Sequence, residues 1–167
     1  LTKRDKTMQK VTPSLAERAR AFAVAAHGTQ LRQWTEEPYW HHLRDVAERV
    51  ALLTDDEEII AAAWLHDVLE DTPKTYGQVH GKFGQRVADL VLDLTDLYTP
   101  ELCPHSNRAK RKALEATRLG LCMPDVRLIK LCDVQSNAGS IEEHGGDFAE
   151  VWRREKAALV KALLRRN

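Results

Sequence analysis

The sequence predicts an all-α protein, and three observations support this fold class. Apolar residues recur at the three- and four-residue spacing of a helix along most of the 167 residues. Helix-capping combinations and Pro or Gly residues divide the chain into segments of helical length. No segment alternates apolar and polar residues over the length of a useful strand. We therefore expect one helical bundle of roughly seven to nine helices.

The first two helices are marked by start and stop signals. Ser14 and Glu17 form a capping box, and Gly28 is placed to end the helix that follows. Residues 29–38 are polar and end in a proline, so a loop is expected there. Helical periodicity returns over residues 39–53. Both predicted helices carry apolar residues along one face, which is typical of helices that cover a core.

A central helix is predicted over residues 55–70. Thr54 and Glu57 have the spacing of a second capping box, and residues 59–65 are almost entirely apolar. A helix that is apolar on several sides is usually buried by its neighbours. The Thr72-Pro73 pair ends this helix, because the residue before a proline is pushed away from helical angles.

The second half of the chain continues as helices separated by short breaks. We expect a short helix near 75–78, a break at Phe83-Gly84 and a helix over 85–93. A proline-containing loop at 96–105 should separate that helix from one over 106–120. Pro124 should open the next helix, and a last helix should begin at 148 with Asp147 as its N-cap. The chain length leaves room for hardly more than one core. A single domain over 13–167 is therefore expected after a flexible segment at 1–12.

Composition argues against several classes of protein. Lys plus Arg and Asp plus Glu both number 25, so no global basic field indicates a nucleic acid polymer as partner. No run approaches the roughly 20 apolar residues of a membrane span, and none near the start resembles a signal peptide. Cys103, Cys122 and Cys132 are too widely spaced for a disulfide framework or a cysteine metal site. These features indicate a cytoplasmic protein with reduced thiols.

One cluster of titratable residues stands at the end of the predicted central helix. His66 and Asp67 directly follow its apolar stretch, where a buried imidazole and carboxylate need a partner or a metal ion. Glu70 and Asp71 each lie four residues further on, which would place all of them on one side of the helix. Three carboxylates at a helix C-terminus oppose the helix dipole. A solvated acidic helix end is the alternative, but the placement favours a functional site that binds a divalent metal ion.

Further metal ligands must come from other helices. His42 and Asp133 both fall among apolar residues, although His41 is an adjacent competitor for His42. Two imidazoles and two carboxylates suit manganese, iron or zinc better than magnesium or calcium. Periodicity alone does not choose between the two adjacent histidines.

An ordered series of motifs gives the chain a resemblance to a known family. The motifs are His27–Arg32, Pro38–His42, Ala62–Thr72, Phe83-Gly84, Asn107-Arg108 with Lys110, and Val126–Asp133 with Asn137. Over about residues 22–141 the chain resembles the HD-domain metal-dependent phosphohydrolases. Within them it is most similar to the hydrolase domains of RelA/SpoT stringent-response enzymes and to the small alarmone hydrolases. The resemblance implies a helical HD-domain fold, a manganese ion or another divalent transition metal, and removal of the 3′-pyrophosphate of (p)ppGpp.

The resemblance also assigns roles to individual residues. His42, rather than His41, takes the place of the first metal ligand because it lies three residues after the tyrosine of its motif. The implied metal ligands are His42, His66, Asp67 and Asp133. The implied catalytic pair, which positions and deprotonates water, is Glu70 and Asp71. The implied substrate contacts are Arg32, Asn137, Ser140, Asn107, Arg108 and Lys110. The implied partner is a small nucleotide, without a nucleic acid polymer or a membrane.

Several departures from the family pattern lie where the base and phosphates would rest. Gln33 replaces a lysine, Glu36-Glu37 replaces a glycine, Leu43 replaces a proline, and Ala138-Gly139 follows Asn137 where a longer residue is common. Two alternatives therefore stay open: an HD phosphohydrolase acting on another nucleotide or an NADPH-like substrate, and a nucleotide-binding module without catalysis. The apolar residues of the last helix suit a core or a dimer seam equally, so the oligomeric state also stays open.

Overall fold

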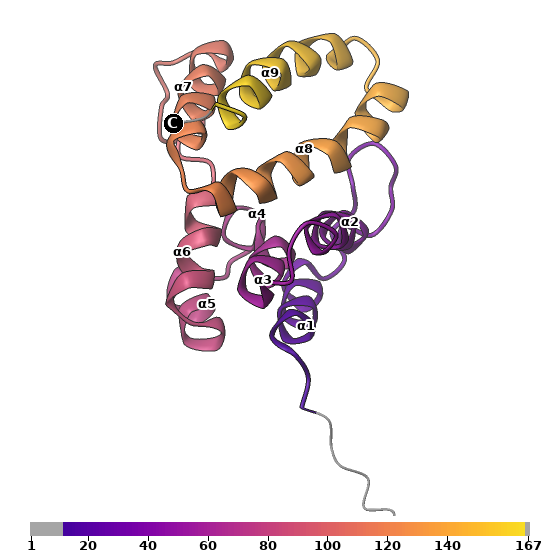
Figure 1. The fold of residues 1–167 in the computed structure, drawn as a ribbon. Helices are drawn as coiled ribbons and strands as arrows, with labels where there is room; N and C mark the ends of the chain where they lie inside the picture. Colours follow the sequence, from indigo (N-terminus) through magenta and orange to yellow (C-terminus); the bar gives the residue numbers. More distant parts are fainter. Residues whose placement is uncertain (1–11, 166–167) are drawn as a thin grey trace, which may run out of the picture.

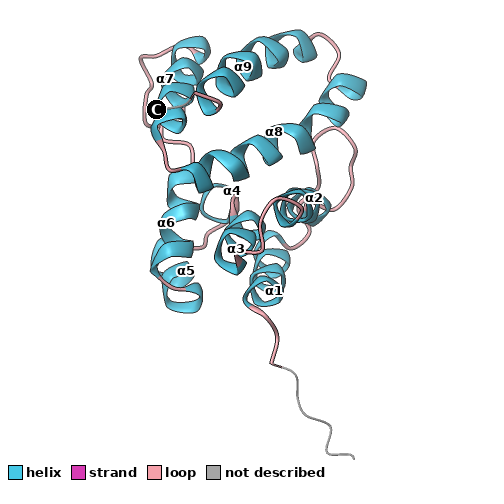
Figure 2. Cartoon of the chain, in the orientation of Figure 1, coloured by secondary structure: helices cyan, strands magenta, loops and turns pink. Residues whose placement is uncertain are grey.

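The computed structural model describes residues 12–165, which form nine α-helices and, apart from one isolated bridge between Leu31 and Pro38, no β-structure (Figure 2). The helices are α1 (Leu15–His27), α2 (Trp40–Ala51), α3 (Glu57–Leu65), α4 (Val68–Asp71), α5 (Tyr76–Phe83), α6 (Gln85–Leu94), α7 (Arg108–Leu121), α8 (Pro124–His144) and α9 (Phe148–Leu163). The predicted all-α fold and number of helices are confirmed. Of the segment 1–12 that is expected to be flexible, residues 1–11 lie outside the described residues.

Helix α8 crosses the molecule between two groups of helices (Figure 1). On one side, α3 lies centrally and contacts α1, α2, α6 and α8. On the other side, α7 and α9 pack against each other and against α8. Side chains of α8 therefore face both the main bundle and the α7–α9 pair, which is the position that a site between the two groups requires.

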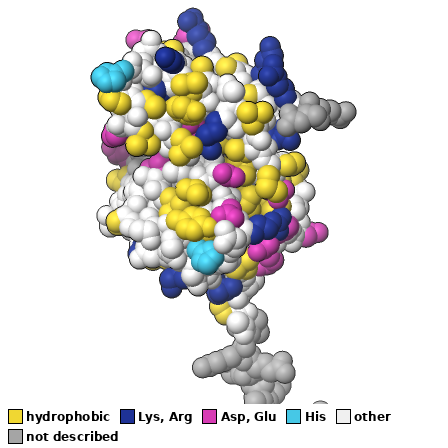
Figure 3. Space-filling model, turned by 90° about the vertical axis from the view of Figure 1, so that its left-hand side faces the viewer, with side chains coloured by type: hydrophobic (Ala, Val, Ile, Leu, Met, Phe, Trp, Pro, Cys, Tyr) yellow, Lys and Arg dark blue, Asp and Glu magenta, His cyan; other side chains and the backbone are white. Residues whose placement is uncertain are grey.

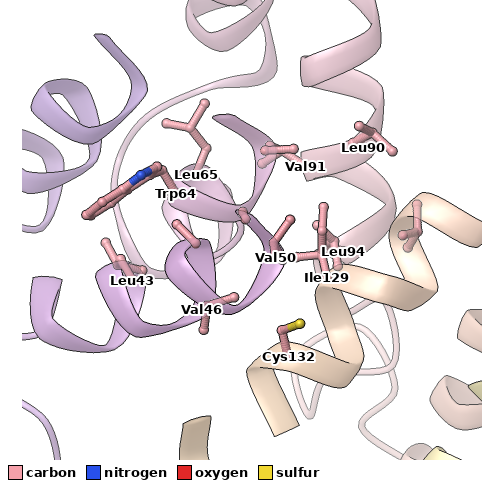
Figure 4. Close-up of a cluster of buried hydrophobic side chains, with 14 of the residues drawn as sticks. Leu43, Val46, Val50, Trp64, Leu65, Leu90, Val91, Leu94, Ile129 and Cys132 are labelled. Atoms are coloured by element: carbon pink, nitrogen blue, oxygen red, sulfur yellow. The ribbon is translucent and has the colours of Figure 1, made fainter. Parts of the chain in front are cut away.

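The main core lies where α2, α3, α6 and α8 meet. Figure 4 shows its larger side chains, which include Leu43, Val46, Val50, Trp64, Leu65, Leu90, Val91, Leu94, Ile129 and Cys132. The apolar face expected for α3 is wide enough to be covered by four neighbours, and its three consecutive alanines at 61–63 are fully buried. Because α3 is held from several sides, the residue that follows it, His66, has a well-defined position.

The helix predicted over 55–70 is wrong as one continuous element, because α3 ends at Leu65 and α4 begins at Val68. Between them Asp67 has φ −100° and ψ 0°, the sparsely populated bridge conformation that often occurs at active sites. The hydroxyl of Tyr39, the residue at the start of α2, donates a hydrogen bond to the Asp67 side chain in this turn. The turn aims the His66 and Asp67 side chains into one space.

The cap of α3 also differs from the predicted one. Asp56, not Thr54, is the N-cap, and its carboxylate accepts hydrogen bonds from the backbone N–H groups of Glu58 and Ile59. Thr54 instead accepts from the backbone N–H of Asp56, so it orders the residue before the cap. A carboxylate at this position is also favoured by the helix dipole.

Other predicted helix signals are confirmed. Ser14 and Glu17 form both hydrogen bonds of a capping box, and Gly28, with φ +55°, ends α1. Pro124 occupies the first turn of α8. The helix expected near 75–78 extends to Phe83, and Asp147 is the N-cap of α9 without a capping hydrogen bond from its side chain.

The α7–α9 pair is closely packed at Gly120. A Cβ atom at this position would lie 3.0 Å from both the Cβ atom and the carbonyl oxygen of Ala162. Only a glycine lets the two helices approach this closely without displacement of one of them. This contact fixes α9 relative to α7, and therefore fixes the wall that α9 presents to α8.

The surface shown in Figure 3 carries hydrophobic side chains interspersed with acidic and basic ones. This mixture fits the zero net charge of the sequence. Among the described residues, none of the helices is both long and apolar enough to span a bilayer.

Candidate metal centre

Two histidines from different helices meet in the interior. His42 of α2 and His66, directly after α3, are each only 2% exposed, and their Nε2 atoms lie 3.3 Å apart. The Nδ1 atom of His66 donates to the carbonyl oxygen of Ala63 at 2.8 Å, because that oxygen can only accept. This hydrogen bond leaves the Nε2 lone pair of His66 free to bind a cation.

The ring of His42 is oriented in the same way. Its Nδ1 atom lies 2.9 Å from the hydroxyl oxygen of Ser136. This hydrogen bond on the outer side of the ring directs Nε2 of His42 at the space it shares with His66, as in metal sites whose imidazoles are oriented by outer hydrogen bonds.

Two carboxylates complete this cluster. Asp133 Oδ1 lies 3.3 Å from His42 Nε2 and 3.9 Å from His66 Nε2. Asp67 Oδ2 lies 2.9 Å from His66 Nε2 and 3.7 Å from His42 Nε2. Separations of this size are expected between ligands of a single transition-metal ion, whose bonds to nitrogen and oxygen are about 2.1 Å long. The residues present therefore fit a divalent metal ion.

Electrostatics in the cluster favour positive charge. Although burial opposes protonation, the Asp67 and Asp133 carboxylates raise the pKa of His66 to about 9. The pKa of Asp67 is lowered in turn: burial would raise it, but the neighbouring His66 outweighs that effect. For Asp133, Lys130 and the two histidines lower the pKa against the effect of burial. A group of anionic and electron-rich atoms that attracts a proton this strongly also attracts a metal cation.

Three side chains outside the cluster orient its carboxylates. The Tyr39 hydroxyl donates to Asp67 Oδ2 at 2.6 Å, and burial together with Asp67 raises its pKa, so it remains a donor. Lys130 Nζ lies 2.9 Å from Asp133 Oδ2, and Asn137 Nδ2 donates to Asp133 Oδ1 at 2.8 Å. Each carboxylate is thus held with one oxygen directed at the imidazoles.

A cavity of about 200 Å³ opens beside this cluster, between α8 and the α7–α9 pair. Its walls include Tyr39, His42, Asp67, Glu70, Asp96, Lys112, Glu115, Lys130, Asp133, Asn137, Glu155 and Lys156. A second pocket of about 350 Å³ adjoins it and shares Glu70, Asp96 and Lys112 with it. A substrate can therefore reach the cluster while part of it remains nearer the surface.

The two acidic residues after Asp67 have different surroundings. Glu70 lines both pockets, and its carboxylate accepts a hydrogen bond from the backbone N–H of Asp96 at 3.2 Å. Desolvation in the cleft, together with the Asp96 and Asp67 carboxylates, raises the pKa of Glu70 to about 7. Both residues are exposed, but Asp71 accepts a hydrogen bond from Gln30 at 3.0 Å and, unlike Glu70, is absent from the cavity wall. Glu70 is therefore the better placed proton acceptor.

The residues expected to contact substrate fall into two groups. Arg32 donates to Asn137 Oδ1 at 2.9 Å and to Ser140 Oγ at 3.2 Å, so these three side chains are brought together. The other three are at the start of α7. Asn107 caps that helix by accepting from the backbone N–H of Lys110, and the Lys110 residue is exposed.

Arg108 belongs to this second group and is already engaged. It forms hydrogen bonds of 2.7 and 2.8 Å with Glu155, and its guanidinium lies 5.3 Å from the centre of the Phe148 ring. It lines the outer pocket but is not part of the wall of the inner cavity. None of the three α7 residues lines the inner cavity.

Sequence reasoning gave no role to four side chains that surround the cluster. Tyr39, Asp96, Lys130 and Lys156 all line the cavity. Lys130 had a usable signal, because it lies three residues before Asp133 on one helix and can pair with it. Asp96, in the loop after α6, and Lys156, on α9, lie far from the metal ligands in sequence, so only the tertiary structure reveals their place in the cavity.

Comparison with known proteins places this cluster in a family. The family model described as HD domain matches residues 19–162. The chain belongs to the HD-domain family. This HD domain is 40% identical over 125 residues to the guanosine-3′,5′-bis(diphosphate) 3′-pyrophosphohydrolase of Aquifex aeolicus, which covers 75% of this chain and 17% of that protein. It is 36% identical over 132 residues to the GTP pyrophosphokinase rsh of Brucella ovis, covering 74% of this chain and 16% of that protein.

The HD domain thus spans about a sixth of the length of these curated relatives. Among solved structures, its fold matches a protein described as a metazoan ortholog of SpoT that hydrolyzes ppGpp, with a TM-score of 0.80 and 24% identity. That match covers 95% of this chain and 90% of the other. A second match, lmo0812 from Listeria monocytogenes, has a TM-score of 0.59 at 20% identity and covers 73% of this chain and 82% of the other. At these identities the two structures show a shared fold.

Proposed function

We propose that this HD domain is a metal-dependent hydrolase that removes the 3′-pyrophosphate of (p)ppGpp or a related alarmone. The observation that carries the proposal is the convergence of His42, His66, Asp67 and Asp133 on one space, with Glu70 on the wall of the adjoining cavity. The printed activity of the Aquifex aeolicus relative supports the choice of reaction. We also propose a cytoplasmic location, where a soluble nucleotide substrate would be available.

The metal that we propose is manganese, with another divalent transition metal as the alternative. His42, His66, Asp67 and Asp133 would hold it, since mixed imidazole and carboxylate sites suit these ions. A bound ion of this kind polarises a phosphate oxygen and lowers the pKa of a bound water.

The side chains around the ion would have separate tasks. Glu70, whose pKa of about 7 lies near neutral pH, would accept the proton from the attacking water. Tyr39 and Asn137 would hold the Asp67 and Asp133 carboxylates in place through their hydrogen bonds of 2.6 and 2.8 Å. Arg32, which lies against Asn137 and Ser140, would face the base or ribose of the nucleotide.

A different nucleotide, including an NADPH-like one, is the second candidate substrate. Gln33 directly follows Arg32, and Ala138-Gly139 directly follows Asn137, so the departures from the family pattern lie beside the proposed nucleoside end of the site. A nucleotide-binding module without catalysis is less well supported, because Glu70, the proposed proton acceptor, lines the cavity beside the group of His42, His66 and Asp133.

A hydrolysis panel with identification of products by mass tests the proposal. Purified protein with a measured manganese content would be incubated with ppGpp, ppApp, NADPH and simple mononucleotides. We expect release of pyrophosphate from ppGpp. Turnover of another nucleotide alone would favour the second candidate, and a folded, metal-containing protein that leaves every nucleotide intact would overturn the assignment as a hydrolase.

A pair of adjacent histidines provides a matched control for the metal site. We expect His42→Ala to lose bound manganese and activity, because His42 is buried among the proposed ligands. His41 is partly exposed and lies near Glu37 at 3.9 Å, so His41→Ala should retain the metal. Equal metal contents in the two variants, measured by elemental analysis, would contradict the assigned ligand set.

A further inference from the structure

Three lysines from three helices line the cavity beside the metal centre: Lys112 of α7, Lys130 of α8 and Lys156 of α9. We propose that Lys156 binds the terminal phosphate of a pyrophosphate group, with Lys112 and Lys130 on either side of the same anion. This inference rests on the proposed function in one respect, because the proposed function makes that pyrophosphate part of a nucleotide. Binding of free pyrophosphate does not depend on it. It assigns a binding role to a helix that contributes neither a proposed metal ligand nor a proposed catalytic residue.

The three lysines differ in their partners. Lys130 Nζ lies 2.9 Å from Asp133 Oδ2, and Lys112 Nζ lies 2.9 Å from Asp96 Oδ2. Within residues 12–165, Lys156 has neither a carboxylate at ion-pair distance nor a hydrogen-bond acceptor for its ammonium group. Among the cavity lysines described, Lys156 is thus the one whose charge is left for a ligand.

The position of Lys156 is unfavourable for an ammonium group without a ligand. Its side chain is partly buried, and burial together with the ammonium groups of Lys130 and Lys112 lowers its pKa to about 8. A polar group that is held at such a cost in free energy often marks a functional site. An anion with several charged oxygens would relieve the repulsion among all three ammonium groups at once.

The other charged side chains of the cavity do not supply this anion. Glu115 forms an ion pair with Arg118, and Glu155 forms one with Arg108. The Asp96 carboxylate is bound by Lys112, and the Asp67 and Asp133 carboxylates are the proposed metal ligands. The Glu70 carboxylate accepts a hydrogen bond from the backbone N–H of Asp96 and, within the described residues, forms no ion pair with a lysine. With a divalent cation bound by those two, the inner cavity combines the positive charge of the ion with an unpaired lysine, which suits a phosphate group that bridges them.

The size of the cavity favours a diphosphate over a whole nucleotide. Its volume of about 200 Å³ lies below the roughly 300–1,000 Å³ typical of pockets that enclose drug-sized ligands. Asn137 lines the cavity and also accepts a hydrogen bond from Arg32, so the nucleoside end of a ligand has a separate place beyond Asn137. The phosphates would then lie between the metal ligands of α8 and Lys156 of α9.

Equilibrium dialysis with labelled inorganic pyrophosphate tests the inference without requiring turnover. Wild-type protein, Lys156→Met, Lys156→Arg and the control Lys161→Met would be compared at one fixed free manganese concentration, so that binding of metal by pyrophosphate in solution is the same for all. Lys161 lies on the same helix and is exposed, and it does not line the cavity. Thermal unfolding of each variant would show that it is folded.

We expect Lys156→Met to bind pyrophosphate about 10- to 100-fold more weakly than the wild type, as is usual when a charged hydrogen-bonding partner is lost. Lys156→Arg should remain within a few-fold of the wild type because it keeps the charge, and Lys161→Met should be unchanged. Wild-type protein without affinity for pyrophosphate would overturn the inference, and so would equal affinities of the wild type and Lys156→Met.

Parallel ppGpp assays separate this inference from the proposed function. Pyrophosphate binding that depends on Lys156 in a protein that does not hydrolyse ppGpp would contradict the proposed function and leave the phosphate site standing. Hydrolysis of ppGpp with an unchanged KM in Lys156→Met, together with unchanged pyrophosphate affinity, would contradict the phosphate site alone.

Discussion

The side-chain amide of Asn137 donates a hydrogen bond to the metal-site carboxylate of Asp133 at 2.8 Å. The same amide accepts from the guanidinium of Arg32 at 2.9 Å. One side chain therefore connects the metal centre to the loop between α1 and α2, whose backbone is closed by the bridge between Leu31 and Pro38. Movement of that loop on nucleotide binding would therefore change the hydrogen bonding of Asp133, a proposed metal ligand.

Replacement of Asn137 by Ala should lower kcat/KM for ppGpp by about 10- to 100-fold, the usual effect of losing an outer partner of a metal ligand. The loss has two causes, because Asp133 loses an orienting donor and Arg32 loses its acceptor. Steady-state kinetics and metal content would both be measured. Gln135→Ala is the control, since Gln135 is exposed on the same helix. Equal kinetics of the two variants would contradict the role of Asn137.

The parts of the fold that the sequence predicted correctly depend on local signals. The Ser14–Glu17 capping box, Gly28 and Pro124 act within one or two helical turns, so they can be recognised without the tertiary structure. The break between α3 and α4 is not predicted, because no proline or glycine marks it and local propensity favours a helix there. In the structure the Asp67 side chain at this break accepts a hydrogen bond from Tyr39, 28 positions away in sequence, a contact that local signals do not reveal.

In the candidate site, too, the residues with a local sequence signal could be predicted and those placed only by tertiary packing could not. His66 and Asp67 were recognisable because two groups that need partners follow an apolar stretch. His42 and Asp133 required the family resemblance, since nothing local distinguishes His42 from His41. Lys156 had no signal, because a lysine on an amphipathic helix is usually a surface residue and only the packing of α9 over the cavity turns it inward.

Glu70 should control the acidic limb of the pH–rate profile. Its carboxylate must be ionised to accept a proton, and its pKa is about 7 before any effect of a metal ion. A bound cation favours the ionised form, so kcat/KM should rise with pH through a midpoint at or below about 7. Glu70→Gln should remove this limb and lower kcat by about 100-fold or more.

Asp71→Asn is the matched control for Glu70→Gln. Asp71 adjoins Glu70 in sequence and is likewise exposed, but it is absent from the cavity wall, so its variant should lose less activity and keep the acidic limb. A larger loss in Asp71→Asn would assign the proton acceptor to Asp71 instead. Stability offers an independent check, since the folded-state pKa of Glu70 is raised from 4.5 to about 7. The metal-free wild type should therefore lose stability relative to Glu70→Gln as pH rises through this window.

Removal of the metal should destabilise the protein more at high pH than at low pH. In the metal-free protein, the Asp67 and Asp133 carboxylates raise the pKa of His66 from 6.5 to about 9. The proton on His66 then stabilises the folded state fully below about pH 6.5, and this contribution is lost as pH rises through about 9. A chelator should lower the Tm only modestly at pH 6 and markedly at pH 9, measured by thermal unfolding at constant ionic strength. The same decrease in Tm at both pH values would contradict this coupling between the proton and the metal.

Two helical glycines should respond in opposite ways to replacement by alanine. At Gly120 the added Cβ would lie 3.0 Å from Ala162, so Gly120→Ala should force α7 and α9 apart at a cost of about 1–3 kcal/mol, only partly offset by the better helix propensity of alanine. At Gly139 of α8 no atom lies within 4 Å of the added Cβ, so Gly139→Ala should raise stability by about 0.5–1 kcal/mol. Chemical denaturation of both variants measures the two free energies of unfolding. Because α9 carries Lys156, Gly120→Ala should also weaken pyrophosphate binding. If Gly120→Ala and Gly139→Ala had equal stability and equal affinity for pyrophosphate, the α7–α9 contact would not control the position of the cavity wall.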